Sequence, residues 1–363
     1  MRPDRDDAIR VGLIGYGFGG EVFHAPLIAS TPGMQLSTIV TANPERQARA
    51  GRAHQSARIV DRIDALLTAA EDHDLAVVST PNVSHVPLGL AALESGLPVI
   101  VDKPLAASAA DGRALAQAAE ERGLLLSVFH NRRWDGDFLT VSRLIGERVL
   151  GPVVRFESRY ERWRPAPIAG AWRERGAPQE AGGLLFDLGS HLIDQAIRLF
   201  GRPTHVYAEI DRRRAGVEVD DDVFVALMHP GGVRAHLWAS VVSATFGARF
   251  RVLGLRGAYE KHGLDVQEEA LIAGGRPGGS DWGREPPERW GHLSDGDAVR
   301  AVETEPGAYP RFYEGIAEAL RSGTAPPVDV REAIEVLEVL EAASVSASTG
   351  TIVTLEREGV SEL

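Results

Sequence analysis

The chain has 363 residues, and its hydrophobic content of 44% supports full cores in two domains of about 150 residues each. Its formal net charge of -12 argues against a nucleic-acid or anionic-membrane partner and favours a small-molecule ligand. The absence of cysteine excludes disulfides, thiolate catalysis and cysteine-bound metal sites.

The N-terminal residues and the hydropathy pattern predict a cytoplasmic location. Met1 to Asp7 carry mixed charge and lack the apolar core of a secretion signal. No apolar run approaches the length of about 20 residues that a membrane-spanning helix needs. We therefore expect no membrane partner.

A glycine-rich turn follows the first predicted strand, residues 9–14. Gly15, Gly17 and Gly20 have the spacing G-x-G-x-x-G, with a strand before them and a predicted helix after them. Gly15 permits the tight turn, Gly17 lets the backbone approach a pyrophosphate, and Gly20 lets helix and strand pack closely. The helix N-terminus offers N–H groups to the phosphates, and Phe18 lies in the same turn. The pattern predicts a dinucleotide site; the alternative is a plain glycine-rich turn.

The residues at the end of the second predicted strand, residues 36–41, are expected to bind the ribose of the cofactor and so to distinguish NAD from NADP. An acid about 20 residues beyond the glycine motif would bind the 2′-hydroxyl of NAD. Here Thr41 and Asn43 can instead hydrogen-bond a 2′-phosphate, and Arg46 can neutralise it. The sequence therefore favours NADP over NAD. It leaves open that Arg46 is an ordinary solvated helix residue and that Glu45 reaches the ribose.

The loop after the predicted strand 75–79 is expected to lie over the same crevice, because ligands bind beyond the carboxyl ends of such strands. Thr80, Pro81, Asn82 and His85 are therefore candidate cofactor contacts. Pro81 also marks a helix entry, so the alternative role of this loop is capping alone.

Lys103 follows a buried apolar run, residues 97–101, that is typical of a parallel strand. A charge at the end of such a strand must be solvated, paired or used. Pro104 cannot donate a backbone hydrogen bond, so the strand stops there and the lysine is held in one place. We interpret Lys103 as a catalytic candidate and cofactor contact; the alternative is a surface lysine at a strand end.

The pattern of elements changes near residue 130. Up to residue 129, strands alternate with helices, which predicts a Rossmann domain over 1–129. Beyond it, longer alternating strands predict a mostly antiparallel sheet with helices on one face. Strands are predicted over 153–163, 204–212, 223–228, 233–242, 250–255 and 258–261, a long loop over 274–297, and closing helices over 309–322 and 330–348. The fold class is α/β, with a second α/β domain over 130–363 whose open sheet face we expect to meet another subunit in a homodimer or homotetramer.

A second polar group stands at helical spacing in this second domain. Asp187, His191 and Asp194 lie at i, i+4 and i+7 and share one helix face. A histidine between two carboxylates is oriented and its charged form favoured, which suits proton transfer. Two alternatives stay open: a metal site, for which no third ligand type is evident, and a structural histidine on a half-buried helix.

Aromatic faces and hydrogen-bond donors suit the binding of a polyol ring. The candidates for such a substrate wall are Arg133, Trp134, Trp163, Trp172, Trp282 and Tyr309. For each tryptophan the alternative is core packing.

These motifs together resemble the Gfo/Idh/MocA family of NAD(P)-dependent oxidoreductases over nearly the whole chain. The similarity is closest to the scyllo-inositol dehydrogenase subgroup, through the stretches 17–26, 130–138, 281–283 and 306–310. In the family, the lysine of Glu-Lys-Pro and a later Asp and His form the catalytic group, which implies these roles for Lys103, Asp187 and His191. This chain has Asp102 where the commoner family form has glutamate, and the shorter acid changes how Lys103 is held.

The resemblance implies hydride transfer between nicotinamide and a secondary alcohol of a cyclitol or sugar, with scyllo-inositol as the best candidate and without a metal. His191 is then expected to take the hydroxyl proton, oriented by Asp187, while Lys103 hydrogen-bonds the reacting oxygen or relays the proton itself. Three alternatives remain: a glycoside hydrolase that uses tightly bound NAD transiently, a regulatory protein that binds NADP without turnover, and a metal-dependent lyase.

Overall fold

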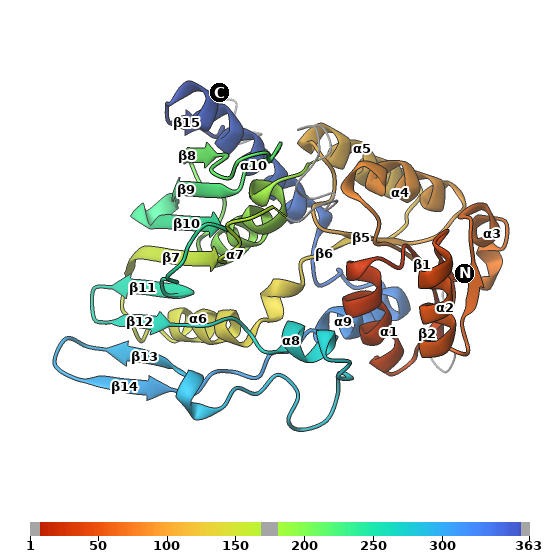
Figure 1. Ribbon diagram of the computed structural model, residues 1–363, viewed down its shortest axis with the longest axis horizontal. Coiled ribbons are helices and arrows are strands. Elements are labelled where there is room, and N and C mark those ends of the chain that lie inside the picture. The colour runs from red at the N-terminus through yellow and green to blue at the C-terminus, as the bar shows by residue number, and fades with distance from the viewer. Residues whose placement is uncertain (1–7, 168–180, 357–363) are drawn as a thin grey trace. The chain divides into compact units, whose positions relative to one another are not determined.

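The computed structural model describes residues 8–167 and 181–356, which fold into two compact units (Figure 1). Unit 1 holds the chain up to Gly136 together with Asp265–Arg284 and Pro306–Ile334, and unit 2 holds the rest. Two segments that lie well beyond residue 129 in the sequence therefore belong to the unit that carries the glycine motif. Within the described ranges, no helix is long and apolar enough to cross a membrane.

Unit 1 is built on a six-stranded parallel sheet with the order β3-β2-β1-β4-β5-β6. Its strands are β1 (Ile9–Ile14), β2 (Met34–Val40), β3 (Arg58–Val60), β4 (Leu75–Val78), β5 (Val99–Asp102) and β6 (Leu126–Phe129). The order reverses between β1 and β4, and in doubly wound sheets ligands bind beyond the carboxyl ends of the strands at this point. Every residue of β4 is fully buried, as expected of a central strand covered on both faces. The predicted Rossmann fold is confirmed.

The helices of unit 1 cover this sheet, with α1 packed on α9 and α4 packed on α5 (Figure 1). They are η1 (Gly19–His24), α1 (Ala25–Ser30), α2 (Pro44–Ala53), α3 (Asp64–Leu67), η2 (Ala70–Asp72), η3 (Asn82–Ser84), α4 (His85–Glu94), α5 (Ala109–Glu121), η4 (Asn131–Trp134), α8 (Gln267–Ile272) and α9 (Pro310–Ser322). The first helix opens with a π-helical turn, in which the Ala25 N–H reaches the Gly20 carbonyl. Pro26 has no N–H for the carbonyl of Val22, and the wider turn before it relieves the clash that a regular α-helix would have there.

Unit 2 contains a nine-stranded mixed sheet with the order β14-β13-β12-β11-β7-β10-β9-β8-β15. Its strands are β7 (Val153–Glu161), β8 (His205–Asp211), β9 (Asp222–Met228), β10 (Arg234–Ser240), β11 (Phe250–Gly254), β12 (Ala258–Lys261), β13 (Gly291–Ser294), β14 (Val299–Val302) and β15 (Val353–Thr354). Among the described strand pairs, β7 with β10 is parallel and the others are antiparallel. The predicted mostly antiparallel sheet is confirmed.

The long loop predicted over 274–297 is wrong in its second half. It contains the short helix η9 (Pro287–Arg289) and then β13, which pairs with β12 and β14. The glycines and prolines of this stretch obscured a short alternation in which Gly291 and Leu293 are buried, His292 is exposed and Ser294 is partly exposed. Pairing with strands elsewhere in the chain stabilises β13, and its own composition does not predict it.

Helices cover one face of the sheet of unit 2. They include α6 (Gly136–Gly146), η7 (Leu185–Gly189), α7 (Ser190–Phe200) and α10 (Val330–Thr349), besides the short turn η8 (Pro230–Gly232), and α6, α7 and α10 lie on the same side (Figure 1). The opposite face carries no helix in the described part of the chain. There the Arg159 guanidinium lies 3.9 Å from the centre of the Trp238 ring, which contacts Phe224. All three side chains are only partly buried, so this face stays open as the sequence predicts.

Candidate active site

The turn of Gly15, Gly17 and Gly20 forms a cradle, which is tightly packed at Gly15 and Gly20 and open at Gly17. Gly15 has φ +103°, and a Cβ there would lie 2.1 Å from the Ser79 carbonyl oxygen, so only glycine fits. A Cβ on Gly20 would lie 2.2 Å from the Gly15 carbonyl oxygen. A Cβ on Gly17 would meet only Arg46 Nη1, at 3.9 Å. The backbone is thus packed tightly against β4 and exposed at Gly17, which fits the approach of a dinucleotide pyrophosphate.

Of the three residues predicted to recognise the ribose, Arg46 lies beside this cradle. The Asn43 side-chain oxygen accepts the Arg46 N–H at 3.0 Å and caps α2, so only its amide NH₂ is left for a ligand. Thr41 is nearly buried, while Arg46 is exposed. Phe18, which is 47% exposed, packs edge-on against Phe23 at the same turn.

The loop after β4 is tied to the Lys103 segment by a buried histidine. His85 places Nδ1 2.8 Å from the Pro104 carbonyl and Nε2 2.9 Å from the Thr80 carbonyl. Burial lowers the pKa of His85, against the opposing effects of Asp102 and the two carbonyls. The His85 ring therefore holds two loops together within unit 1.

The other residues of this loop are arranged around η3. The Ser84 hydroxyl lies 2.8 Å from the Thr80 hydroxyl and 2.7 Å from the Pro81 carbonyl. Thr80 and Asn82 are partly exposed and Pro81 is exposed, at the carboxyl end of β4. These side chains thus remain accessible to a ligand.

Lys103 lies at the carboxyl end of β5, half-buried and followed by a cis peptide bond to Pro104. Its backbone N–H donates to Asp102 Oδ1 at 2.9 Å, and the Ser79 hydroxyl donates to Asp102 Oδ2 at 3.2 Å. Burial alone would raise the pKa of Asp102, but the His24 imidazole and the positive charge of Lys103 lower it to about 2. A permanent negative charge therefore adjoins Lys103.

The predicted proton-transfer residues of unit 2 lie on two consecutive helical segments. Asp187 is half-buried on the π-helical η7, while His191 and Asp194 are 4% and 2% exposed on α7. The ring of His191 lies 6.5 Å from that of Tyr160, between centroids. Among the described residues there is no group of three or more His, Asp or Glu side chains that would hold a metal ion.

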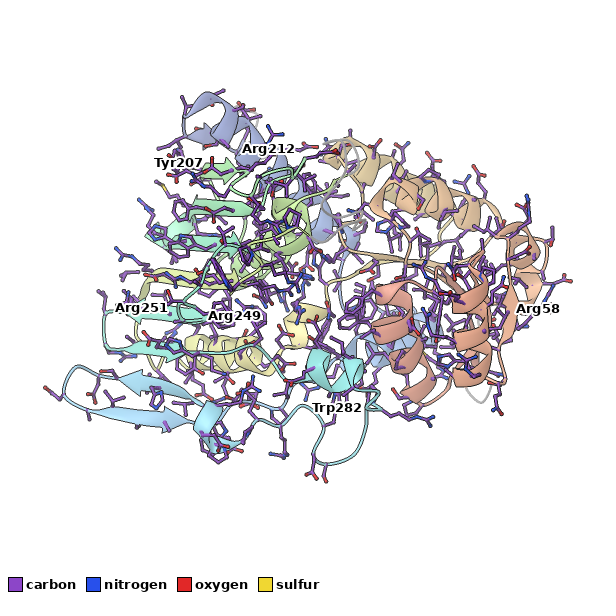
Figure 2. The ribbon with its side chains drawn as sticks, in the orientation of Figure 1. Arg58, Tyr207, Arg212, Arg249, Arg251 and Trp282 are labelled. Carbon is purple, nitrogen blue, oxygen red and sulfur yellow. The ribbon has the colours of Figure 1, made fainter. Side chains whose placement is uncertain are left out.

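Two residues that the sequence analysis missed support these segments. Arg249, just before β11, is 2% exposed and donates at 2.9 Å to both the Tyr160 hydroxyl and the Gln195 side chain on α7 (Figure 2). Asp220 accepts the Leu185 N–H at 2.7 Å at the start of η7, and burial raises the pKa of Asp220 to about 6. Neither residue carries a local motif, because each acts through contacts distant in the sequence.

Three of the predicted substrate-wall residues meet at Gln267, a fully buried side chain of α8 that the sequence analysis did not single out. Gln267 Nε2 donates to the Trp134 carbonyl, and Gln267 Oε1 accepts from Trp282 Nε1, each at 3.0 Å. The Tyr309 N–H donates to the same oxygen at 2.7 Å. Of these side chains, that of Trp282 is labelled in Figure 2. Tyr309 is fully buried and its hydroxyl donates to Asp135 at 2.7 Å. Trp134 and Trp282 keep partly exposed rings.

The other three wall candidates are Arg133, Trp163 and Trp172. Arg133 is 7% exposed and pairs with Glu332 at 2.6 Å. Trp163 belongs to unit 2 and is 53% exposed. Trp172 lies outside the described residues.

Comparison with known proteins covers nearly the whole chain. Residues 9–130 match the GFO_IDH_MocA model, described as an oxidoreductase family with an NAD-binding Rossmann fold. Residues 142–355 match the model of the C-terminal alpha/beta domain of the same family.

Individual relatives match at full length. The chain is 42% identical over 339 residues to the uncharacterised oxidoreductase YdgJ of Escherichia coli (strain K12), covering 92% of this chain and 95% of that protein. It is 37% identical over 354 residues to scyllo-inositol 2-dehydrogenase (NADP(+)) IolW of Bacillus subtilis (strain 168), covering 96% and 97%. The structure of the oxidoreductase YvaA from Bacillus subtilis superposes with a TM-score of 0.90 at 36% identity, over 96% of this chain and all of that one.

Proposed function

Since the chain belongs to the Gfo/Idh/MocA family of NAD(P)-dependent oxidoreductases, we propose that it transfers a hydride between NADP and a secondary alcohol of a cyclitol or sugar, with scyllo-inositol as the first candidate. The 37% identity to IolW over 96% of the chain is the observation that supports scyllo-inositol as the substrate. D-apiose dehydrogenase, a second relative named for a sugar, is 27% identical over 95% of this chain.

The cradle of unit 1 is where the cofactor would bind. Gly15, Gly17 and Gly20 would hold the pyrophosphate, with Phe18 and the 80–82 loop beside them. When bound, the nicotinamide supplies the hydride acceptor. We favour NADP because the Arg46 guanidinium approaches Gly17 and because IolW is named for NADP.

The chain's own residues would handle the proton and orient the alcohol. Lys103 would hydrogen-bond the reacting oxygen, and a lysine on a half-buried strand end can also relay a proton. In unit 2, His191 would take the hydroxyl proton, with Asp187 orienting it. Arg133 would donate hydrogen bonds to hydroxyl groups of the substrate. The exposed aromatic rings among the wall candidates would pack against the polyol ring.

The proposal is tested by following the absorbance of the reduced nicotinamide with purified protein, NADP⁺ or NAD⁺, and a panel headed by scyllo-inositol, myo-inositol and common aldoses. We expect turnover with scyllo-inositol and NADP⁺. Turnover only with another polyol would refute the substrate and keep the reaction. Retained cofactor without net reduction would favour the hydrolase or the regulatory protein. Substrate conversion that a chelator stops and that reduces no nicotinamide would favour the lyase.

We also propose that the protein forms a homodimer or homotetramer through the open sheet face of unit 2. Arg159, Phe224 and Trp238 expose apolar and stacked surface there, as interfaces do. The family resemblance supports the same face.

A further inference from the structure

A fully buried histidine joins four elements of unit 1 next to the Lys103 segment. His24, on η1, has Nδ1 2.6 Å from the Tyr313 hydroxyl of α9 and Nε2 3.5 Å from Asp102 Oδ2 at the end of β5. Its ring lies 4.3 Å from that of Phe129, the last residue of β6. Nε2 makes no hydrogen bond within the described residues, and its polar contact is the ion-pair distance of 3.5 Å to the Asp102 carboxylate.

Two polar groups hold this ring from opposite sides, the Tyr313 hydroxyl and the Asp102 carboxylate. Tyr313 is fully buried, and burial raises the pKa of its hydroxyl well above the ordinary value, so the hydroxyl keeps its proton. The hydroxyl shares one hydrogen bond of 2.6 Å with His24 Nδ1, in which either atom can be the donor. The ring of His24 thus lies between the Tyr313 hydroxyl and the Asp102 carboxylate.

Asp102 in turn fixes the backbone of Lys103. One carboxylate oxygen accepts the Lys103 N–H at 2.9 Å, a bond that the short aspartate side chain makes to its own neighbour. The other oxygen faces the glycine motif so closely that a Cβ on Gly19 would lie 2.7 Å from it. These contacts restrict the orientation of the Asp102 carboxylate, and His24 and Ser79 contact its second oxygen.

We propose that His24 is a positioning residue for Lys103, which acts by holding the Asp102 carboxylate with the help of Tyr313. The inference rests on the proposed role of Lys103 in the reaction. His24 is fully buried and contacts its neighbours rather than solvent, so its effect on turnover would be exerted through Asp102.

The test compares four variants with the unmodified chain, by kcat, by KM for the alcohol, by Kd for NADP⁺ and by melting temperature. His24→Leu removes both ring nitrogens, while His24→Gln keeps one acceptor and one donor. His73→Leu is the matched control, because His73 is also buried and hydrogen-bonded, to Thr38 and Ala69, but lies before the amino end of β4, whereas Asp102 lies at the carboxyl end of β5. Lys103→Met tests the premise.

We expect His24→Leu to lower kcat by about tenfold to a hundredfold, the size of effect that misplacing a reacting group produces, with KM and Kd within about threefold. His24→Gln should recover most of kcat, and His73→Leu should lose melting temperature without losing kcat. Any of three results would overturn the inference. The first is a kcat of His24→Leu within about twofold of that of the unmodified protein. The others are a loss of kcat in His24→Gln, or in His73→Leu, as large as that in His24→Leu. If Lys103→Met keeps its kcat, the proposed mechanism itself fails; if that variant is inactive and His24→Leu is not, only the role of His24 fails.

Discussion

Arg46 offers the sharpest test of cofactor choice, because its guanidinium approaches the open side of the cradle at Gly17. A 2′-phosphate carries a charge of about -1.5 to -2. A cation about 4 Å away in water gains about 1 kcal/mol per unit charge, so Arg46→Ala should cost about 1.5–2 kcal/mol of NADP⁺ binding. That corresponds to a loss of about 10- to 30-fold in affinity, since 1.4 kcal/mol is tenfold.

The assay measures kcat/KM for NADP⁺ and for NAD⁺ in parallel. NAD⁺ lacks the phosphate, so its kcat/KM should change by less than about threefold, and the loss with NADP⁺ should shrink as ionic strength rises. Arg52→Ala is the matched control, because Arg52 is an exposed cation in the last turn of the same helix, α2.

Two results would refute the reasoning about Arg46. An equal loss with both cofactors would mean that Arg46 supports the fold of the cradle and does not read the phosphate. An equal loss in the Arg46 and Arg52 variants would mean that only the net charge of the helix matters.

Three further predictions follow from other parts of the molecule. Lys103→Met and His191→Asn should each lower kcat in steady-state assays by about 10²–10⁴-fold if the residue takes part in proton transfer. A near-normal kcat in either variant would exclude that residue from proton transfer. Because burial raises the pKa of Asp220 from 3.8 to about 6, the stability that its neutral form contributes is present below 3.8 and is lost as the pH rises through 6. Asp220→Asn should therefore be more stable than the unmodified protein near pH 7, by up to about 3 kcal/mol, with the difference vanishing towards pH 4 in urea unfolding; a pH-independent difference would contradict this. Trp238→Glu should lower the molar mass in sedimentation velocity, whereas Ile272→Glu, at a 57% exposed position on α8, should not; an unchanged mass for Trp238→Glu would place the interface elsewhere.

Local motifs carried most of what could be predicted in unit 1. The spacing of Gly15, Gly17 and Gly20 reflects requirements of a few neighbouring atoms, a positive φ and two close backbone approaches, which the structure contains. The alternation of apolar strands with helices predicts the parallel sheet for a similar reason. The apolar residues of each strand are enough to predict that the strand is buried. Lys103 could be singled out because a charge directly after such a strand is unusual.

Long-range contacts decided the rest, since one sequence without its fold does not say which distant residues meet. His24 and Tyr313 are 289 positions apart, and nothing in either segment predicts the other. Gln267 gathers Trp134, Trp282 and Tyr309 only because the chain returns to unit 1 after building most of the sheet of unit 2. The glycine turn and the alternation of strands and helices in unit 1 could be predicted from the sequence, because they depend on local geometry and burial. Only the tertiary structure shows which buried polar groups lie around Lys103, because His24, Ser79 and Tyr313 reach Asp102 or one another across 23 to 289 positions, once the sheet has formed.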